Sequence, residues 1–227
     1  MNKEISMAEV ISKIKDGASL MIGGFAVVGT PCGIVDTILE AGIKDLTIIG
    51  NDTGFEERGV GLLVTKRRVK KVIASHIGMN KQVGLQMSEG SLEVELVPQG
   101  TLVERIRAAA FGLGGVLTPT GLGTAVQEGK EVLNIDGKDF LLEKPLTADF
   151  ALLYGEKADK AGNIAYRGAQ VNFNHCMAGA AALTIVETGE VVEIGGIDPN
   201  QVVTPGIFID FVVGTGGKQY GQERNAY

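Results

Sequence analysis

The sequence predicts an α/β protein built on an open, mostly parallel sheet with helices on both faces, plus a small β-hairpin insertion. Over residues 1–110, short apolar runs alternate with segments of helical periodicity, as expected for consecutive β-α-β units. Most of these apolar runs are continuous, which is typical of parallel strands covered on both faces. Glycine accounts for 33 of 227 residues, about twice its usual ~7%, without a collagen-like period. The glycines therefore indicate many turns and close approaches of the backbone.

The elements of the first half follow from local signals. Ser6 and Glu9 predict a capping box for a helix that ends at Gly17. Buried strands are expected at residues 19–22 and 46–49, with a helix over residues 34–41 between them. The alternation continues with strands at 69–75 and 92–97 and helices at 81–88 and 102–110. Thr101 is the expected N-cap of the last helix.

Past residue 112 this alternation ends. Residues 112–123 form a loop rich in Gly, Pro and Thr that is too long for a simple connection, which indicates a functional loop or a partner surface. Asp136-Gly137 predicts a hairpin over residues 132–142. Further strands are expected at 150–154, 183–187 and 207–213, and residues 177–182 as the end of a close-packed helix. We expect residues 1–217 to form one domain and residues 218–227 a polar C-terminal tail.

Composition and charge exclude several classes of protein. The net charge of −6 and the pI of about 5.1 argue against nucleic acid as a partner, because binding phosphates needs a basic surface. Cys32 and Cys176 are too few for a disulfide framework, and with two histidines they make a poor zinc set, so no metal is expected. The uncharged residues 17–35 and 108–127 are interrupted by glycine and proline, and the N-terminus lacks a signal-peptide pattern. We therefore expect a cytoplasmic protein that does not bind membranes.

The expected ligand site lies at the carboxyl edge of the sheet. In open α/β sheets, ligands bind beyond the carboxyl ends of the strands. Residues 23–31 and 50–52 follow two predicted strands and fall at that edge. The first loop lacks both the G-x-G-x-x-G spacing and the P-loop lysine, so neither nucleotide fingerprint applies. Taken alone, its paired glycines indicate only a tight turn.

The first loop nevertheless resembles the coenzyme A-binding signature of the α subunits of family I CoA-transferases. The matching residues read Ile22-Gly23-Gly24-Phe25-x-x-x-Gly29-x-Pro31. Further blocks that resemble the family, in its order, are Val97-Pro98-Gln99-Gly100-Thr101, Leu117-Thr118-Pro119-Thr120-Gly121, Ala158-Asp159-Lys160-Ala161-Gly162-Asn163, Asn172-Phe173-Asn174 and Val203-Thr204-Pro205-Gly206. The resemblance covers residues 1–213 and looks closest to acetate and butyrate–acetoacetate CoA-transferases. It implies the fold shared with sugar-phosphate isomerases and deaminases (NagB–RpiA-like).

The resemblance also implies a covalent, ping-pong transfer of CoA through a glutamyl-CoA thioester. In the family, the glutamine of the Pro-Gln-Gly block helps to form the oxyanion hole, and by match this residue is Gln99. Asn51 and Asp52 match a pair of asparagines near the reacting thioester. Asp52 departs from the double-Asn form, and a carboxylate there can raise the pKa of the nucleophile. The residues that match the CoA-binding loop are Gly23, Gly24, Phe25, Gly29, Thr30 and Pro31.

The nucleophile itself is missing from this chain. In the family it lies in a Glu-Asn-Gly motif on the β subunit, and no such motif occurs in these 227 residues. The nearest string, Ser88-Glu89-Gly90, lies in a polar stretch and is expected to be exposed. The resemblance thus implies a β-subunit partner that carries the glutamate, in an α2β2 assembly or a multiple of it. It implies no permanently bound cofactor, because coenzyme A arrives with the substrate.

Some alternatives stay open. The chain is either a transferase subunit, a non-catalytic CoA-binding or scaffolding subunit, or a sugar-phosphate isomerase or deaminase. Gln99 and the absence of a clear acid/base pair favour the transferase. Acetate, butyrate and acetoacetate are the expected acids, with succinate and 3-oxoadipate open. His76 is either a hydrogen-bonded histidine at a strand end or part of the site, and His175 is undecided. The basic residues 66–71 are either a solvated helix end or a contact for CoA phosphates or the partner.

Overall fold

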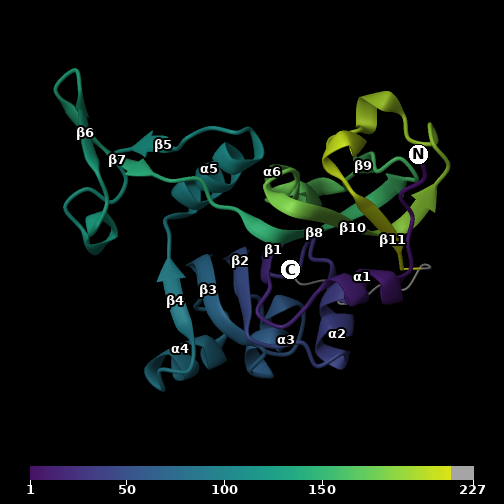
Figure 1. Ribbon diagram of the computed structural model, residues 1–227, viewed down its shortest axis with the longest axis horizontal. Helices are drawn as coiled ribbons and strands as arrows, with labels where there is room; N and C mark the ends of the chain where they lie inside the picture. Colours follow the sequence, from purple (N-terminus) through teal and green to yellow (C-terminus); the bar gives the residue numbers. More distant parts are fainter. Residues whose placement is uncertain (216–227) are drawn as a thin grey trace.

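The computed structural model of the protein describes residues 1–215, and its centre is an eight-stranded sheet (Figure 1). The strand order is β11-β10-β8-β1-β2-β3-β4, and every neighbouring pair along this order is parallel. Strand β9 pairs with β8 in the antiparallel direction. The main strands are β1 (Ser19–Ile22), β2 (Leu46–Asp52), β3 (Val69–His76), β4 (Glu93–Leu96), β8 (Ala148–Asp159), β9 (Ile164–Ala165), β10 (Ala181–Val192) and β11 (Phe211–Gly214). The predicted parallel α/β sheet is confirmed.

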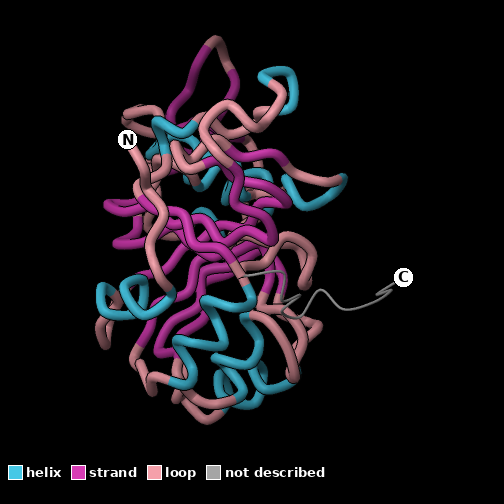
Figure 2. The backbone as a smooth tube through the Cα atoms, turned by 90° about the vertical axis from the view of Figure 1, so that its right-hand side faces the viewer, coloured by secondary structure: helices cyan, strands magenta, loops and turns pink. Residues whose placement is uncertain are grey.

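Helices cover both faces of this sheet, as predicted. Figure 1 shows α1, α2, α3 and α4 along one face and α5 and α6 on the other, and Figure 2 shows the sheet between these layers. The helices are α1 (Met7–Lys13), α2 (Cys32–Glu40), α3 (Val60–Thr65), α4 (Lys81–Ser88), α5 (Gln99–Ala110) and α6 (Asn174–Met177). Short 3₁₀ turns occupy Ala125–Gln127, Gly168–Val171, Pro199–Gln201 and Gly206–Phe208.

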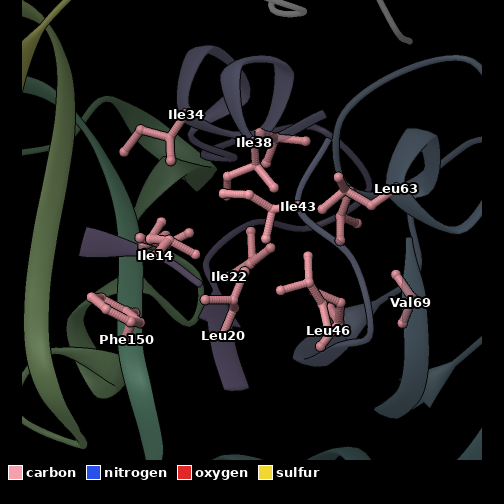
Figure 3. Close-up of a cluster of buried hydrophobic side chains, with 14 of the residues drawn as sticks. Ile14, Leu20, Ile22, Ile34, Ile38, Ile43, Leu46, Leu63, Val69 and Phe150 are labelled. Atoms are coloured by element: carbon pink, nitrogen blue, oxygen red, sulfur yellow. The ribbon is translucent and has the colours of Figure 1, made fainter. Parts of the chain in front are cut away.

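Each face has its own apolar core. On the first face, Ile34 and Ile38 of α2 pack over Leu20 and Ile22 of β1, with Leu46 of β2 beside them (Figure 3). On the second face, the core contains Leu102 and Ile106 of α5 and Met177 of α6. Two cores on opposite faces require strands that are apolar on both sides, which is why β1 and β2 read as continuous apolar runs.

The helix N-termini agree only in part with the sequence. The capping box of α1 is present: Glu9 N–H donates to Ser6 Oγ at 3.3 Å, and Ser6 N–H donates to Glu9 Oε2 at 2.8 Å. The prediction of Thr101 as a cap is wrong. Helix α5 begins at Gln99 with Pro98 as its N-cap residue, and this puts Thr101 inside the first turn, where it is buried.

Two expectations in the C-terminal third are also wrong in part. Residues 207–213 are not one strand, because Gly206–Phe208 form a 3₁₀ turn after Pro205 and β11 begins only at Phe211. The helix expected over residues 177–182 ends at Met177. Gly179 then takes a φ of 84°, and Ala181 already pairs with Ala148 of β8. Sheet pairing here overrides the helix propensity of the alanines.

The predicted hairpin is confirmed and belongs to a small second sheet. Strands β6 (Val132–Ile135) and β7 (Lys138–Glu143) join at Asp136 and Gly137, whose φ angles of 51° and 78° fit a tight hairpin turn. Strand β5 (Val116–Thr118) pairs with β7 and interrupts the loop expected over residues 112–123. We call residues 112–146 the arm, and Figure 1 shows it projecting from the main sheet beside α5.

Among residues 1–215, no helix combines the length and the apolar character that crossing a bilayer requires. The predicted tail, residues 218–227, lies outside the described residues, as does the proposed domain boundary at residue 217.

Candidate active site

The residues that the sequence singled out meet at the carboxyl edge of the sheet. A pocket of about 420 Å³ opens there between the ends of β2 and β3, the loop after β1 and the first turn of α5. Its lining residues are Phe25, Asn51, Asp52, Ser75, His76, Met79 and Gln99. The structure thus brings together Gln99, Asn51, Asp52 and Phe25, and adds Ser75, His76 and Met79.

Gln99 and Asn51 form the centre of this pocket. The Gln99 Nε2 group donates a hydrogen bond to Asn51 Oδ1 at 2.5 Å. Ser75 Oγ donates to the Asn51 carbonyl oxygen at 2.7 Å and fixes that strand end. A carboxamide carries two N–H groups, so Gln99 keeps one for a ligand after serving Asn51. Gln99 is therefore a positioned hydrogen-bond donor at the site.

Asp52 serves the surrounding backbone. Its carboxylate accepts hydrogen bonds from the N–H of Ala26, the N–H of Gly54 and the Asn51 side chain, each at 2.8 Å. The two backbone donors, Ala26 and Gly54, belong to the loops that follow β1 and β2. Asp52 thus holds two loops and the Asn51 amide in place, which is the geometry of a positioning residue.

Those two loops have the same local structure, a likeness that the sequence reading missed. Phe25 bridges Val28 in the first loop, and Phe55 bridges Arg58 in the second. The shared signal is Gly-Phe, then three other residues and a second Gly, at residues 24–29 and 54–59. Both loops precede a helix, α2 and α3 respectively.

The glycines of the first loop contact other parts of this chain. A Cβ at Gly23 would lie 1.9 Å from Asn174 Oδ1, and one at Gly24 would lie 2.1 Å from Thr30 Oγ1. At Gly29, where φ is +75°, a Cβ would lie 2.5 Å from the Gln170 carbonyl oxygen. The need for glycine at these positions therefore arises from internal packing.

Of the six residues in the predicted CoA loop, only Phe25 lines the pocket. Its side chain is 47% exposed, whereas the other five are buried behind it. The buried residues are Gly23, Gly24, Gly29, Thr30 and Pro31. Contact between the loop and coenzyme A stays a prediction, and Phe25 is the side chain placed to make it.

The Asn172-Phe173-Asn174 block explains how the loop keeps its shape. Asn172 accepts a hydrogen bond from Gly24 N–H at 3.0 Å and donates to the Val28 carbonyl at 2.9 Å. Asn174 donates to the Gly29 carbonyl at 2.9 Å and accepts from Tyr154 N–H at 3.0 Å. These asparagines are positioning residues whose role the motif alone did not reveal.

Behind the loop, the carboxylate of Glu187 on β10 caps helix α2. It accepts hydrogen bonds from Gly33 N–H at 3.1 Å and Ile34 N–H at 2.7 Å. Burial raises the pKa of Glu187 to about 7, although the two N–H groups oppose that rise. Burial likewise raises the pKa of the Cys32 thiol to about 12, so this buried cysteine is an unreactive thiol.

The remaining candidates lie apart from the pocket. Residues 66–71 lie before and at the start of β3, and at ~3.3 Å per residue Lys71, the last of them, is about 17 Å from His76 at the pocket end of that strand. Within the cluster, Arg67 pairs with Glu89 at 2.7 Å and Lys71 with Glu93 at 2.8 Å. His175 lies on α6 with its Nε2 3.2 Å from Cys176 Sγ and does not line the pocket.

The fold and the pocket together define a class of protein. The family model described as "Coenzyme A transferase" matches residues 4–215, so the chain belongs to this family. Among curated relatives, it is 48% identical to the acetate CoA-transferase subunit alpha of Escherichia coli K12, over 93% of this chain and 96% of that protein. It is 49% identical to the acetoacetyl-CoA:acetate/butyrate CoA transferase alpha subunit of Clostridium acetobutylicum, over 94% and 98%. The chain corresponds to the α subunit of a heteromeric CoA-transferase.

Solved structures agree on the fold. The acyl-CoA transferase YdiF of E. coli O157:H7, in a thioester complex with CoA, superposes with a TM-score of 0.84 at 20% identity. The match covers 96% of this chain and 52% of that one, so this chain spans about half of the longer protein. Glutaconate CoA-transferase from Acidaminococcus fermentans gives a TM-score of 0.82 at 22% identity, over 93% of this chain and 75% of that one.

Proposed function

We propose that this α subunit belongs to a short-chain acyl-CoA:carboxylate CoA-transferase that exchanges CoA among acetate, butyrate and acetoacetate. The names of the two relatives described above, which are nearly half identical over almost their whole length, support this choice of acids. Relatives named for 3-oxoadipate and for succinyl-CoA and 3-ketoacids are 45% and 44% identical, which supports the transfer reaction more strongly than any single acid. The proposed location is the cytoplasm.

The observation that carries the proposal is the Gln99–Asn51 pair at the pocket. Attack of a carboxylate on a thioester carbonyl produces a tetrahedral oxyanion, which needs donors that are already in position. The 2.5 Å bond to Asn51 holds the Gln99 amide and leaves one N–H for that oxyanion. One such donor contributes about 2.7–4 kcal/mol to transition-state stabilisation.

The nucleophile comes from a partner in this proposal. A β-subunit glutamate attacks the acyl-CoA carbonyl, and the CoA thiolate leaves, which gives an acyl-glutamyl anhydride. The thiolate then attacks the glutamyl carbonyl and releases the first carboxylate. The resulting glutamyl-CoA thioester passes CoA to the incoming carboxylate by the reverse sequence. The absence of Glu-Asn-Gly from these 227 residues supports a nucleophile in trans, and we propose an α2β2 assembly.

Coenzyme A acts only as part of the substrate in this scheme, without a permanently bound cofactor. We propose that it passes over the loop of residues 23–31, where Phe25 is the exposed side chain at the pocket. Binding of the remote parts of CoA can then lower the barrier at the thioester.

The first test is to co-express the chain with its β subunit and to assay CoA transfer from acetyl-CoA to butyrate. We expect Gln99→Ala to lower kcat about 10²–10³-fold with little change in the KM for acetyl-CoA. Gln201→Ala, at an exposed glutamine that does not line the pocket, is the matched control and should keep full activity. An unchanged kcat for Gln99→Ala would remove Gln99 from the oxyanion role.

The same assay separates the alternatives. An α–β complex without transferase activity would favour a CoA-binding or scaffolding subunit. Turnover of a sugar phosphate by the chain alone would favour an isomerase.

A further inference from the structure

His76 is the one polar residue of the pocket whose side chain the previous sections leave without a role. It is the last residue of β3, exposed, and paired in register with Asp52 of β2. Within residues 1–215, its ring nitrogens make no hydrogen bond or ion pair with the protein. The sequence left two possibilities for this residue, and the structure favours the one in which it is part of the site.

One edge of the ring lies close to the backbone of Gly78. A Cβ on Gly78 would lie 3.0 Å from Cε1 and 3.2 Å from Nε2 of His76, so the backbone at Gly78 lies against the ring edge. Gly78 itself has an ordinary backbone conformation, since its φ is not positive. The absence of a side chain at position 78 therefore makes room for the imidazole, which stands at the wall of the pocket.

The other polar groups of the pocket already serve one another. The Asn51 side-chain oxygen accepts a hydrogen bond from Gln99, and its amide group donates one to Asp52. The Asp52 carboxylate accepts three hydrogen bonds in all. Ser75 donates its hydroxyl to the Asn51 carbonyl. The second N–H of Gln99 faces the reacting carbonyl in the proposed function. The donors that remain are the second amide hydrogen of Asn51 and the ring of His76, and an imidazole offers an N–H in both its neutral and its charged form. Of these two residues, His76 is the one at the end of β3.

The two apolar side chains of the pocket, Phe25 and Met79, suit a short hydrocarbon chain. An acyl group whose carbonyl lies at Gln99 would extend its chain into the rest of this pocket, toward the end of β3. A donor in that wall contributes binding energy only to a chain that carries an oxygen there.

We propose that His76 determines acyl specificity by donating a hydrogen bond to an oxygen on the third carbon of the acyl chain. This inference rests on the proposed function and adds to it the residue that discriminates among its acids: through His76, short 3-oxoacyl groups are favoured over plain alkanoyl groups of the same length. Acetoacetate and butyrate form the ideal pair for comparison, because both have four carbons and differ by the 3-oxo oxygen.

The test compares these two acids as CoA acceptors from acetyl-CoA, with the intact α–β complex. His76→Phe removes both ring nitrogens and keeps an aromatic ring, and His76→Gln restores a donor. We expect His76→Phe to lower kcat/KM for acetoacetate about fivefold to tenfold while kcat/KM for butyrate stays within twofold. His76→Gln should recover part of the loss for acetoacetate.

Met79→Leu is the matched control, since it changes an apolar wall of the same pocket and should affect both acids equally. Thermal melting of each complex verifies folding. If His76→Phe lowers kcat/KM equally for both acids, or lowers it for neither, the role of His76 is wrong. CoA transfer by the wild-type complex would still support the proposed function in that case. A wild-type complex that transfers CoA to neither acid would overturn both. Transfer to butyrate without transfer to acetoacetate would overturn the inference alone.

Discussion

At position 23, the side chain that glycine lacks would occupy the space of a hydrogen-bonded amide. Asn174 Oδ1 lies 1.9 Å from that point, and its amide binds the Tyr154 N–H and the Gly29 carbonyl. We therefore expect Gly23→Ala to displace Asn174 and to lower the free energy of unfolding by about 2 kcal/mol, since buried polar groups lose their partners. Urea denaturation of the variant measures this loss.

Gly84 provides the control, because a Cβ there would meet nothing within 4 Å and the residue lies in the middle of α4. Gly84→Ala should raise the free energy of unfolding by about 0.5–1 kcal/mol, through higher helix propensity. If both variants changed the free energy of unfolding equally, Asn174 would be able to move aside without loss of stability. The packing argument would then be wrong.

These residues also show where sequence reasoning stops. The motif marked Gly23, Gly24 and Gly29 correctly as residues that must be glycine, but it suggested a ligand as the cause. For Gly24 the cause visible in the structure lies in the loop itself, at Thr30, whereas for Gly23 and Gly29 it lies far along the chain, in residues 170–174. No local pattern encodes such a contact, because it depends on how β8 and α6 return to the sheet beside β1.

At the scale of elements, helix α2 begins on a buried carboxylate. Its N-cap residue is Pro31, which provides no side-chain cap, and Glu187 on β10 accepts from the first N–H groups instead. Burial raises the pKa of Glu187 from 4.5 to about 7, so the folded state holds this proton more tightly than the unfolded chain does. Its contribution to stability is therefore full below about pH 4.5 and is lost as the pH rises through about 7.

We expect Glu187→Gln to remove this pH dependence, because the amide keeps a hydrogen-bond acceptor and cannot ionise. Between pH 5 and pH 8 the wild type should lose up to about 3 kcal/mol of unfolding free energy relative to the variant. Urea titrations at both pH values measure it. A constant gap would indicate that Glu187 has the same pKa in the folded and unfolded chains.

Most elements of the first half were predictable, since strands such as Ser19–Ile22 and helices such as Lys81–Ser88 carry strong local signals. The ends of the elements were less predictable. Strand β2 continues through Asn51 and Asp52, which the sequence placed in a loop, because β3 offers them partners up to His76. The pocket residues Ser75 and Met79 escaped prediction for a related reason: their chemistry is ordinary, and only the sheet register brings them to Asn51.

At the scale of the whole molecule, ion pairs join the arm to the body. Arg105 of α5 donates to the Lys144 carbonyl at 3.0 Å and lies 3.2 Å from Glu95 of β4. It also lies 3.9 Å from Glu143 of β7, a carboxylate with a side chain only 2% exposed, which Lys130 contacts at 2.6 Å. These contacts connect β4, α5 and the arm at the position where the arm leaves the sheet in Figure 1.

Because Arg105 touches both parts of the molecule, its loss should loosen the arm and leave the sheet intact. Arg105→Ala removes the contacts to Lys144, Glu95 and Glu143, and within residues 1–215 it leaves the buried Glu143 carboxylate with Lys130 as its partner. We expect a local loss of about 2 kcal/mol. Amide hydrogens of β6 and β7 should then exchange ~30-fold faster, while those of β1 and β2 keep the wild-type rate.

Arg107→Ala is the control on the same helix: its pair with Glu104 is 43% exposed on both sides, so its removal should change no exchange rate noticeably. Faster exchange throughout the main sheet in Arg105→Ala would instead mean that Arg105 supports the core, and that the arm and the body unfold as one unit.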